Sequence, residues 1–215
     1  MEEYEKNLRN IRRHFDDPAI IVGFRRHDTM LLSLYKQYLQ QGGTAPLDRF
    51  FNPGDSETIV RREDLLFKKR LQYLEDRFSR IFVYTQEEMS DRLPRLTEDL
   101  ARFLGVPVPA SEEVTESRKN VSVRGEFQVR LLRRLNRINR KLNTTPWLPS
   151  LDNRLFDWLD LSPRRLTQRR LAGVESSPMT LPPDLQSCLE KEFEGDWAYV
   201  RQWTENRMDY RFSTR

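Results

Sequence analysis

The sequence is poor in cysteine and histidine. Cys188 is the only cysteine among 215 residues, and His14 and His27 are the only histidines. A single cysteine excludes an internal disulfide and favours a reducing compartment. On a helical pattern with apolar neighbours, Cys188 is expected to be a small buried group. Because the two histidines lie far apart and no Cys/His cluster accompanies them, the sequence predicts no metal site.

Long apolar runs are also lacking. No stretch approaches the roughly 20 apolar residues of a membrane-spanning helix, and residues 1–15 lack the apolar centre of a signal peptide. We therefore expect a cytoplasmic protein with no transmembrane segment. Residues 1–15 are instead rich in charge and predict a helix that ends before Pro18.

The excess of positive charge is small. The chain has 37 Lys and Arg against 33 Asp and Glu, a net charge of +4, which does not by itself indicate a nucleic-acid partner. Hydrophobic residues make up 37% and charged residues 33% of the chain. This composition is typical of one globular domain, which we expect to span residues 1–215.

What the sequence does contain is two short apolar segments that predict strands. Ala19–Phe24 and Arg80–Thr85 are rich in Ile, Val and aromatic residues. The first is a continuous apolar run, as expected of a strand that is buried on both faces of a parallel sheet. Helical spacing follows each of them, over residues 29–41 and residues 93–104.

The ends of these two helices carry recognisable signals. Asp28 is placed to cap the first helix at its N-terminus, and Gly42 and Gly43 follow its last residues. Pro94 suits the first turn of the second helix, and Gly105 suits its C-terminal cap. Two strands that are each followed by an amphipathic helix predict an α/β fold, with a parallel sheet flanked by helices.

The rest of the chain divides into helical and irregular segments. Residues 63–78, 131–142 and 185–193 have helical spacing, the last ending before "GDWAYVRQW". Residues 44–62 and 144–183 contain prolines and polar residues without a period, so irregular structure is expected there.

The end of the first strand predicts an anion site. Arg25 follows the strand directly and should project from the carboxyl edge of the sheet, where open α/β folds place their ligands. A guanidinium can bind phosphate with two hydrogen bonds, and a helix N-terminus adds free N–H groups. Ser33 lies eight residues later, away from the apolar stripe, and is a candidate second donor. An ordinary exposed arginine and serine explain these two positions equally well.

The stretch "IIVGFRRHDTMLLSLYKQYLQQGG" resembles the second nucleotide motif of the sulfotransferases that use 3′-phosphoadenosine 5′-phosphosulfate. That motif has a strand, an Arg, usually Asn-Pro, a Ser eight positions after the Arg, and a Tyr soon after. Arg25, Ser33 and Tyr35 match it, whereas Arg26 and His27 replace Asn-Pro. In the family the Arg and the Ser bind the 3′-phosphate, so the resemblance implies this role for Arg25 and Ser33.

Later segments extend the resemblance. "RIFVYTQEEMSDRLPRLTEDLARFLGVPVP" is similar to the family's strand, acidic turn and helix, with Glu87 or Glu88 standing for the acid of the turn. The resemblance implies a P-loop-NTPase-like sulfotransferase fold and the phosphosulfate nucleotide as co-substrate, with a small-molecule, sugar or lipid acceptor. It also implies that Arg118, Lys119 and Arg124 add cations to the nucleotide site.

One family element has no counterpart. The family begins with a strand and a glycine-containing loop with Lys and Ser/Thr, which binds the 5′-phosphosulfate, and nothing before Ile20 resembles it. The catalytic base follows that loop in the family, so no catalytic residue is predicted here. His27 is expected to have a loop or supporting role rather than that of a base. We expect an N-terminally truncated sulfotransferase whose first strand would lack a neighbour.

Two alternatives remain. A degenerate relative would bind the 3′-phosphate nucleotide, or its bisphosphate product, without catalysis. The segment "RGEFQVRLLRRLNRINRKLN" could instead bind nucleic acid through its arginines. The second alternative is less favoured, because no aromatic residues are interleaved on the basic face and no known nucleic-acid motif is present.

Overall fold

The computed structural model describes residues 2–109, 125–144 and 177–206. They form two compact units. Unit 1 contains the described residues of 1–27, 62–117 and 187–215. Unit 2 contains those of 28–61 and 118–186. The expectation of a single domain over residues 1–215 stays a prediction.

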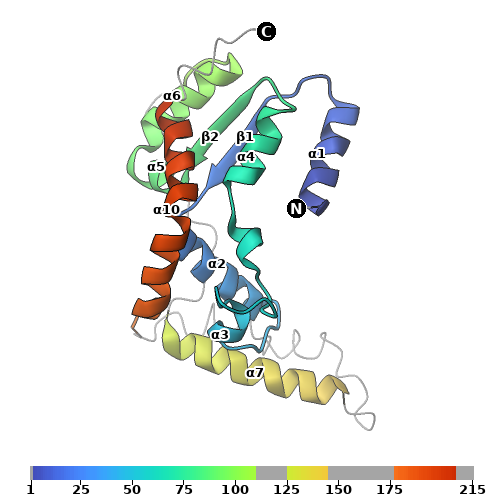
Figure 1. Ribbon diagram of the computed structural model, residues 1–215, viewed down its shortest axis with the longest axis vertical. Helices are drawn as coiled ribbons and strands as arrows, with labels where there is room; N and C mark the ends of the chain where they lie inside the picture. Colours follow the sequence, from blue (N-terminus) through green and yellow to red (C-terminus); the bar gives the residue numbers. More distant parts are fainter. Residues whose placement is uncertain (1, 110–124, 145–176, 207–215) are drawn as a thin grey trace. The chain divides into compact units, whose positions relative to one another are not determined.

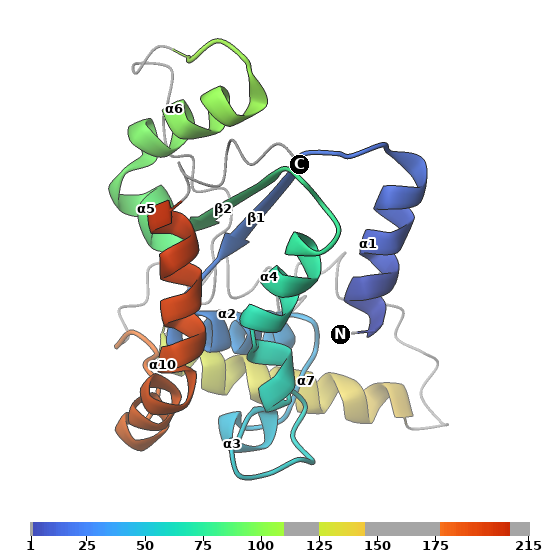
Figure 2. The same cartoon turned by 45° about the horizontal axis from the view of Figure 1, so that its top comes forward.

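Unit 1 contains a parallel pair of strands. β1 (Ile20–Phe24) and β2 (Ile81–Thr85) pair in register, with Ile20 opposite Ile81 and Phe24 opposite Thr85. They lie side by side in both views (Figure 1 and Figure 2). Both predicted strands and their parallel direction are confirmed, so the carboxyl ends of the two strands share one edge of the sheet.

The burial of β1 differs from the expectation. Its residues alternate in exposure, and Ile21 is 46% exposed, whereas a strand covered on both faces was predicted. On the face that carries Ile21, helix α6 packs on β2, where the ring of Phe103 lies 5.3 Å from that of Phe82. Within the described part of the chain, β2 is also the only strand that pairs with β1. The apolar run of β1 therefore lies at a sheet edge.

Helical elements surround the strands of unit 1. They are α1 (Glu2–His14), the 3-10 helix η1 (Arg62–Leu65), α4 (Lys68–Glu75), α5 (Gln86–Asp91), α6 (Leu93–Leu104) and most of α10 (Pro183–Glu205). The predicted end of α6 is confirmed, because Gly105 has φ 71° and its N–H bonds the last turn. The predicted helix over residues 63–78 is divided into η1 and α4.

Helix α10 is longer than predicted. We expected it to end near Phe193, but it continues to Glu205. Two features explain the difference. Gly195 keeps a helical backbone with open space beside it, and the buried stripe of the helix continues with Val200 and Trp203. The burial of these side chains offsets the cost of one helical glycine, which is about 1 kcal/mol. Cys188, expected to be buried, is only partly buried.

Unit 2 consists of most of α2 (His27–Gln40), α3 (Leu47–Phe50) and α7 (Glu126–Thr144). Asp28 was predicted to be the N-cap of α2, but the helix begins one residue earlier. The Asp28 carboxylate instead accepts a hydrogen bond from the N–H of Thr29 at 2.7 Å. Short α3 interrupts the segment that was predicted to be irregular.

The C-terminal end of α2 is held by α7. The side-chain amide of Asn136 donates hydrogen bonds to the carbonyls of Leu39, at 2.8 Å, and Gly43, at 2.7 Å. Gly42 has φ 94°, as the predicted stop signal requires. Asn136 thus connects α7 to the end of α2 and to the turn that follows it.

Two remaining expectations concern other parts of the chain. Most of the predicted irregular segment, residues 145–176, lies outside the described residues. Every described helix is too short or too polar to cross a membrane.

Candidate functional site

The two central residues of the predicted nucleotide site belong to different units. Arg25 lies in unit 1, directly after β1, and is half-buried. Its guanidinium makes no hydrogen bond or ion pair with any described residue. Ser33 is exposed on α2 in unit 2 and is likewise without a described partner. Arg118, Lys119 and Arg124 lie outside the described residues.

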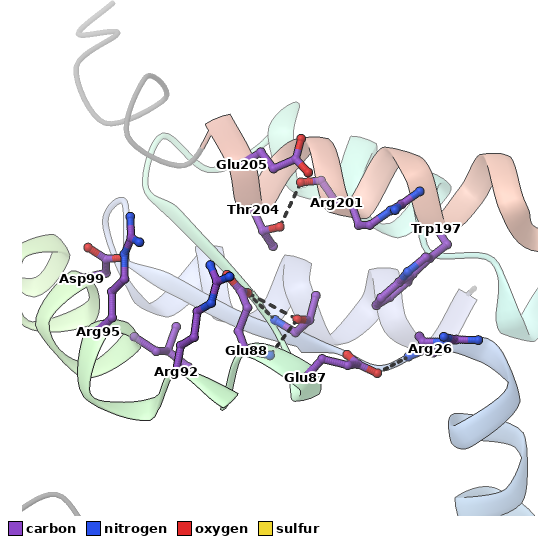
Figure 3. A pocket seen from close by; sticks show the side chains of 12 residues that line it. Arg26, Glu87, Glu88, Arg92, Arg95, Asp99, Trp197, Arg201, Thr204 and Glu205 are labelled. Carbon is purple, nitrogen blue, oxygen red and sulfur yellow. Dashed lines mark hydrogen bonds between the residues drawn. The ribbon is translucent and has the colours of Figure 1, made fainter. Parts of the chain in front are cut away.

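Unit 1 contains a cleft at the carboxyl edge of its two strands. The cavity has a volume of about 520 Å³ and is lined by Thr85, the last residue of β2, and by Arg26, two residues after β1. Charged side chains of both signs also line it. They are Arg26, Arg92, Arg95 and Arg201, with Glu87, Glu88, Asp99 and Glu205. We call this cavity the arginine cleft (Figure 3).

Three of the four acidic residues have structural partners. Glu88 forms a capping box with Thr85, since each side chain accepts a hydrogen bond from the other residue's N–H, at 2.9 and 3.2 Å. Asp99 pairs with Arg102 at 3.2 Å. One oxygen of Glu87, Oε1, accepts a hydrogen bond from the N–H of Arg26 at 3.4 Å. Glu88 therefore fixes the turn after β2, and Glu87 connects that turn to the end of β1.

The second oxygen of Glu87 has no such role. Oε2 is buried, and no described group donates a hydrogen bond to it. An unpaired buried carboxylate oxygen is costly, by roughly 1–3 kcal/mol or more. Such an atom at the wall of a cavity indicates a place where a ligand can supply the missing donor.

Most arginines of the cleft, unlike most of its acids, lack a described hydrogen-bond or ion-pair partner. Arg26 forms an ion pair with Glu190, at 3.7 Å. The guanidinium groups of Arg92, Arg95 and Arg201 make no hydrogen bond or ion pair within the part of the chain that the structure describes. Figure 3 shows that Arg92 and Arg95 come from one side of the cavity, and that Arg201 comes from α10 on the other.

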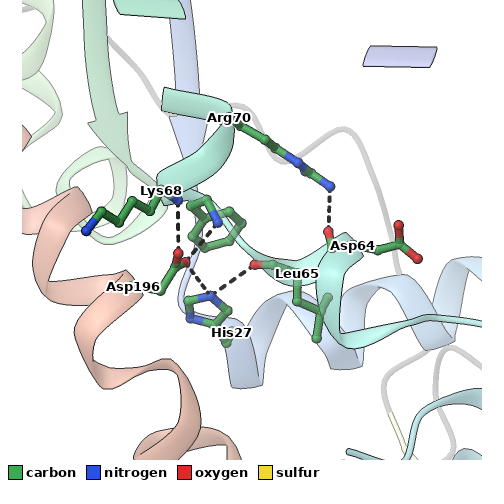
Figure 4. Close-up of polar contacts among 7 residues, drawn as sticks. His27, Asp64, Leu65, Lys68, Arg70 and Asp196 are labelled. Carbon is green, nitrogen blue, oxygen red and sulfur yellow. Dashed lines mark hydrogen bonds and ion pairs between the residues drawn. The ribbon is translucent and has the colours of Figure 1, made fainter. Parts of the chain in front are cut away.

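A second polar group lies behind the cleft, in the core of unit 1. The Nε2 atom of His27 is 3.1 Å from Asp196 Oδ2 and 3.1 Å from the carbonyl oxygen of Leu65 (Figure 4). The Asp196 carboxylate also accepts hydrogen bonds from the N–H groups of Phe67, at 2.8 Å, and Lys68, at 2.9 Å. Asp196 therefore caps the N-terminus of α4 from a distant part of the chain.

The geometry sets the role of each member of this pair. Both neighbours of His27 Nε2 are acceptors, so this nitrogen carries a proton and donates it. Burial acts to raise the pKa of Asp196, but the hydrogen bonds from His27, Phe67 and Lys68 outweigh it and hold that pKa below its ordinary value. Asp196 is therefore a buried carboxylate held by three donors.

Aromatic rings enclose the imidazole of His27. Phe67 and Phe193 stack on it with centroids at 4.4 and 4.5 Å, and Trp197 meets it edge-on at 6.2 Å. His27 is thus a buried structural residue at the start of α2 and not part of a loop. Its role with respect to catalysis stays a prediction.

Sequence reasoning placed Arg25 correctly after β1 but missed both the arginine cleft and the His27–Asp196 pair. His27 and Asp196 are 169 positions apart, and no motif connects them. The signal that was present is a polar Asp between Phe193 and Trp197, on the apolar face of a helical pattern. A buried position with a polar residue indicates a specific partner.

Comparison with known proteins does not assign the chain to a family. No protein-family model matches it. Searches of curated proteins and of solved structures also gave no match. Among the described residues, no group of three or more His, Cys, Asp or Glu side chains is arranged to hold a metal ion. The function must therefore be inferred from the chain's own residues.

Proposed function

We propose that this chain binds 3′-phosphoadenosine 5′-phosphosulfate through its 3′-phosphate and transfers the sulfuryl group to a hydroxyl or amine acceptor. The observation that carries the proposal is Arg25. It is a half-buried guanidinium without a described partner, and it follows a parallel strand at the edge where α/β folds bind ligands. The sequence resemblance gives the proposal its chemistry, with Ser33 as the second donor to the phosphate.

The proposed reaction needs charge stabilisation more than a special nucleophile. The acceptor oxygen or nitrogen forms a bond to sulfur, and the bond from sulfur to the 5′-phosphate oxygen breaks. The electron pair leaves with the adenosine 3′,5′-bisphosphate, and the acceptor's proton passes to solvent or a base. Cationic groups that hold the nucleotide in place favour this step by positioning it and by stabilising the leaving phosphate.

Binding without catalysis is the second candidate. It is favoured by the environment of His27, which stands where the resembling motif has proline and whose Nε2 is already engaged by Asp196 and Leu65. His27 is therefore not positioned to accept a proton from an acceptor at that atom. In this case the chain would bind the nucleotide or its bisphosphate product and not turn it over.

A calorimetric titration tests the nucleotide site. Adenosine 3′,5′-bisphosphate should bind at least tenfold more tightly than adenosine 5′-monophosphate, since only the first has a 3′-phosphate. Arg25→Ala should remove most of this difference, because a charged hydrogen bond contributes about 1.5–3 kcal/mol. Arg25→Lys should restore part of it, since lysine keeps the charge but not the planar pair of donors.

The control is Arg13→Ala, on the exposed surface of α1. This variant should bind both nucleotides as the unmodified chain does. Equal affinity of the unmodified chain for the two nucleotides would contradict the proposal. Transfer of labelled sulfate from the donor to an acceptor mixture then separates the enzyme from the non-catalytic binder.

A further inference from the structure

The arginine cleft has properties that the nucleotide proposal does not use. Three of its guanidinium groups, those of Arg92, Arg95 and Arg201, have no partner among the described residues. Arg92 lies at the junction of α5 and α6 and Arg95 in α6, whereas Arg201 comes from α10 on the opposite side of the cavity. A ligand that reaches all three must carry negative charge at more than one place. A volume of about 520 Å³ is in the range of cavities that hold an organic ligand rather than a single inorganic anion.

The cleft also contains an acceptor that a hydrogen-bond donor on a ligand could satisfy. The buried Oε2 atom of Glu87 has no described partner, and a donor on the ligand can satisfy it. Four acidic residues line the cleft beside the arginines. They repel a dense cluster of charge such as a bisphosphate, but they suit a ligand that combines separated single charges with many hydroxyl groups.

Trp197 supplies an apolar surface at the same place. It lines the cleft one turn before Arg201, so the two side chains share one face of α10. Edge contacts with His27, at 6.2 Å, and Phe67, at 6.4 Å, hold the indole ring in place. A fixed aromatic ring can pack against a flat, weakly apolar ligand surface such as one face of a sugar ring.

We infer that the arginine cleft binds an acidic saccharide, with its carboxylate or sulfate groups on Arg92, Arg95 and Arg201. One sugar ring packs on Trp197, and a hydroxyl group donates to Glu87 Oε2. If the proposed function holds, on which this last step rests, the saccharide is the sulfuryl acceptor and its free hydroxyl is the group that attacks sulfur.

The test uses a defined probe, a hexasaccharide of alternating glucuronic acid and N-acetylglucosamine. Its matched control is the same hexasaccharide with every carboxylate reduced to an alcohol. The unmodified protein should bind the acidic form at least tenfold more tightly than the neutral one. Salt should weaken binding of the acidic form only, because it screens the exposed charges. Equal affinity for the two forms would overturn the inference.

Variants locate the binding. Arg201→Ala and Arg92→Ala should each weaken binding of the acidic hexasaccharide about tenfold, and Trp197→Ala should weaken both forms. Arg13→Ala, far from the cleft in unit 1's α1, should bind as the unmodified chain does. Unchanged saccharide binding in both arginine variants would place the site elsewhere and refute the inference.

The same variants separate this inference from the proposed function. Adenosine 3′,5′-bisphosphate should bind normally to Arg92→Ala and Arg201→Ala, and lose affinity only when Arg25 is changed. Loss of bisphosphate affinity in the cleft variants would overturn the saccharide assignment, because the cleft would then be a nucleotide site. Saccharide binding without any bisphosphate binding would support the cleft assignment and contradict the proposed function.

Discussion

Two faces of α10 in unit 1 each carry a charged residue and a tryptophan, but they differ in burial and in hydrogen bonding. On one face, Asp196 and Trp203 are buried, and the Asp196 carboxylate accepts three hydrogen bonds. On the other face, Trp197 and Arg201 line the arginine cleft, and the Arg201 guanidinium has no described partner. Polar groups that the fold satisfies serve its stability, whereas polar groups that it leaves unsatisfied beside a cavity are available to a ligand.

The largest loss of stability is expected from a substitution on the buried face of α10. Phe193 is 1% exposed and stacks on His27. Phe193→Ala should lower the free energy of unfolding by about 4 kcal/mol, because a large core side chain is lost and a cavity remains. Urea denaturation followed by circular dichroism measures this. The exposed Gln202→Ala on the same helix serves as control and should change stability by less than about 0.5 kcal/mol.

A somewhat smaller loss is expected at Asp196. Asp196→Ala removes an acceptor shared by three donors, those of His27, Phe67 and Lys68, and leaves the buried N–H of Phe67 without a partner. The free energy of unfolding should fall by about 3 kcal/mol. Glu194→Ala, an exposed acid two positions earlier, should have almost no effect on it. If the two variants proved equally stable, the buried face would not depend on its carboxylate.

The pH dependence of stability tests whether the ionised Asp196 carboxylate stabilises the fold. The hydrogen bonds to Asp196 outweigh its burial and hold its pKa below the ordinary value in the folded state. A group with a lowered folded pKa stabilises the fold fully above its unfolded pKa of about 4, and this contribution is lost as the pH falls through the folded value. The stability difference between the unmodified chain and Asp196→Asn should therefore shrink as the pH falls from 5 to 2, roughly the range of that titration. Denaturation curves at several pH values measure it, and a difference that grows towards low pH would contradict the assignment.

The smallest effect is expected on the cleft face. Arg201→Ala should change the free energy of unfolding by less than about 0.5 kcal/mol, because an exposed arginine without a partner contributes little to stability. Thermal unfolding measures this. A loss above about 1 kcal/mol would mean that Arg201 has a structural role, and the two faces of α10 would no longer differ in the way described here.

The sequence predicted the elements whose signals are local. Both strands of unit 1 are apolar runs with clear ends, and α6 has Pro94 in its first turn and Gly105 at its end. Each of these signals acts within a few residues of the structure it specifies. The continuation of α10 was missed because Gly195 was taken as a boundary, although a glycine ends a helix only where the backbone leaves the helical region.

The candidate site was predictable only in part. The place of Arg25 directly after a strand was predicted correctly, because this is a local relation, whereas its role as a phosphate ligand stays a prediction. Arg92, Arg95 and Arg201 are ordinary exposed arginines in the sequence, and only the structure shows that they share a cavity and lack described partners. The pairing of His27 with Asp196 joins residues 169 positions apart, so no local pattern could reveal it. The predicted roles of Ser33 and of the cations at 118–124 stay predictions.

The bonds of Asp196 also bear on when unit 1 can fold. During synthesis α4 leaves the ribosome long before Asp196, which lies 129 positions after Phe67. Until then the N–H groups at the start of α4 and the imidazole of His27 lack their shared carboxylate. Contacts between such distant residues close large loops, which slows folding and favours incomplete intermediates. The synthesis of α10 is therefore the event that permits unit 1 to complete its core.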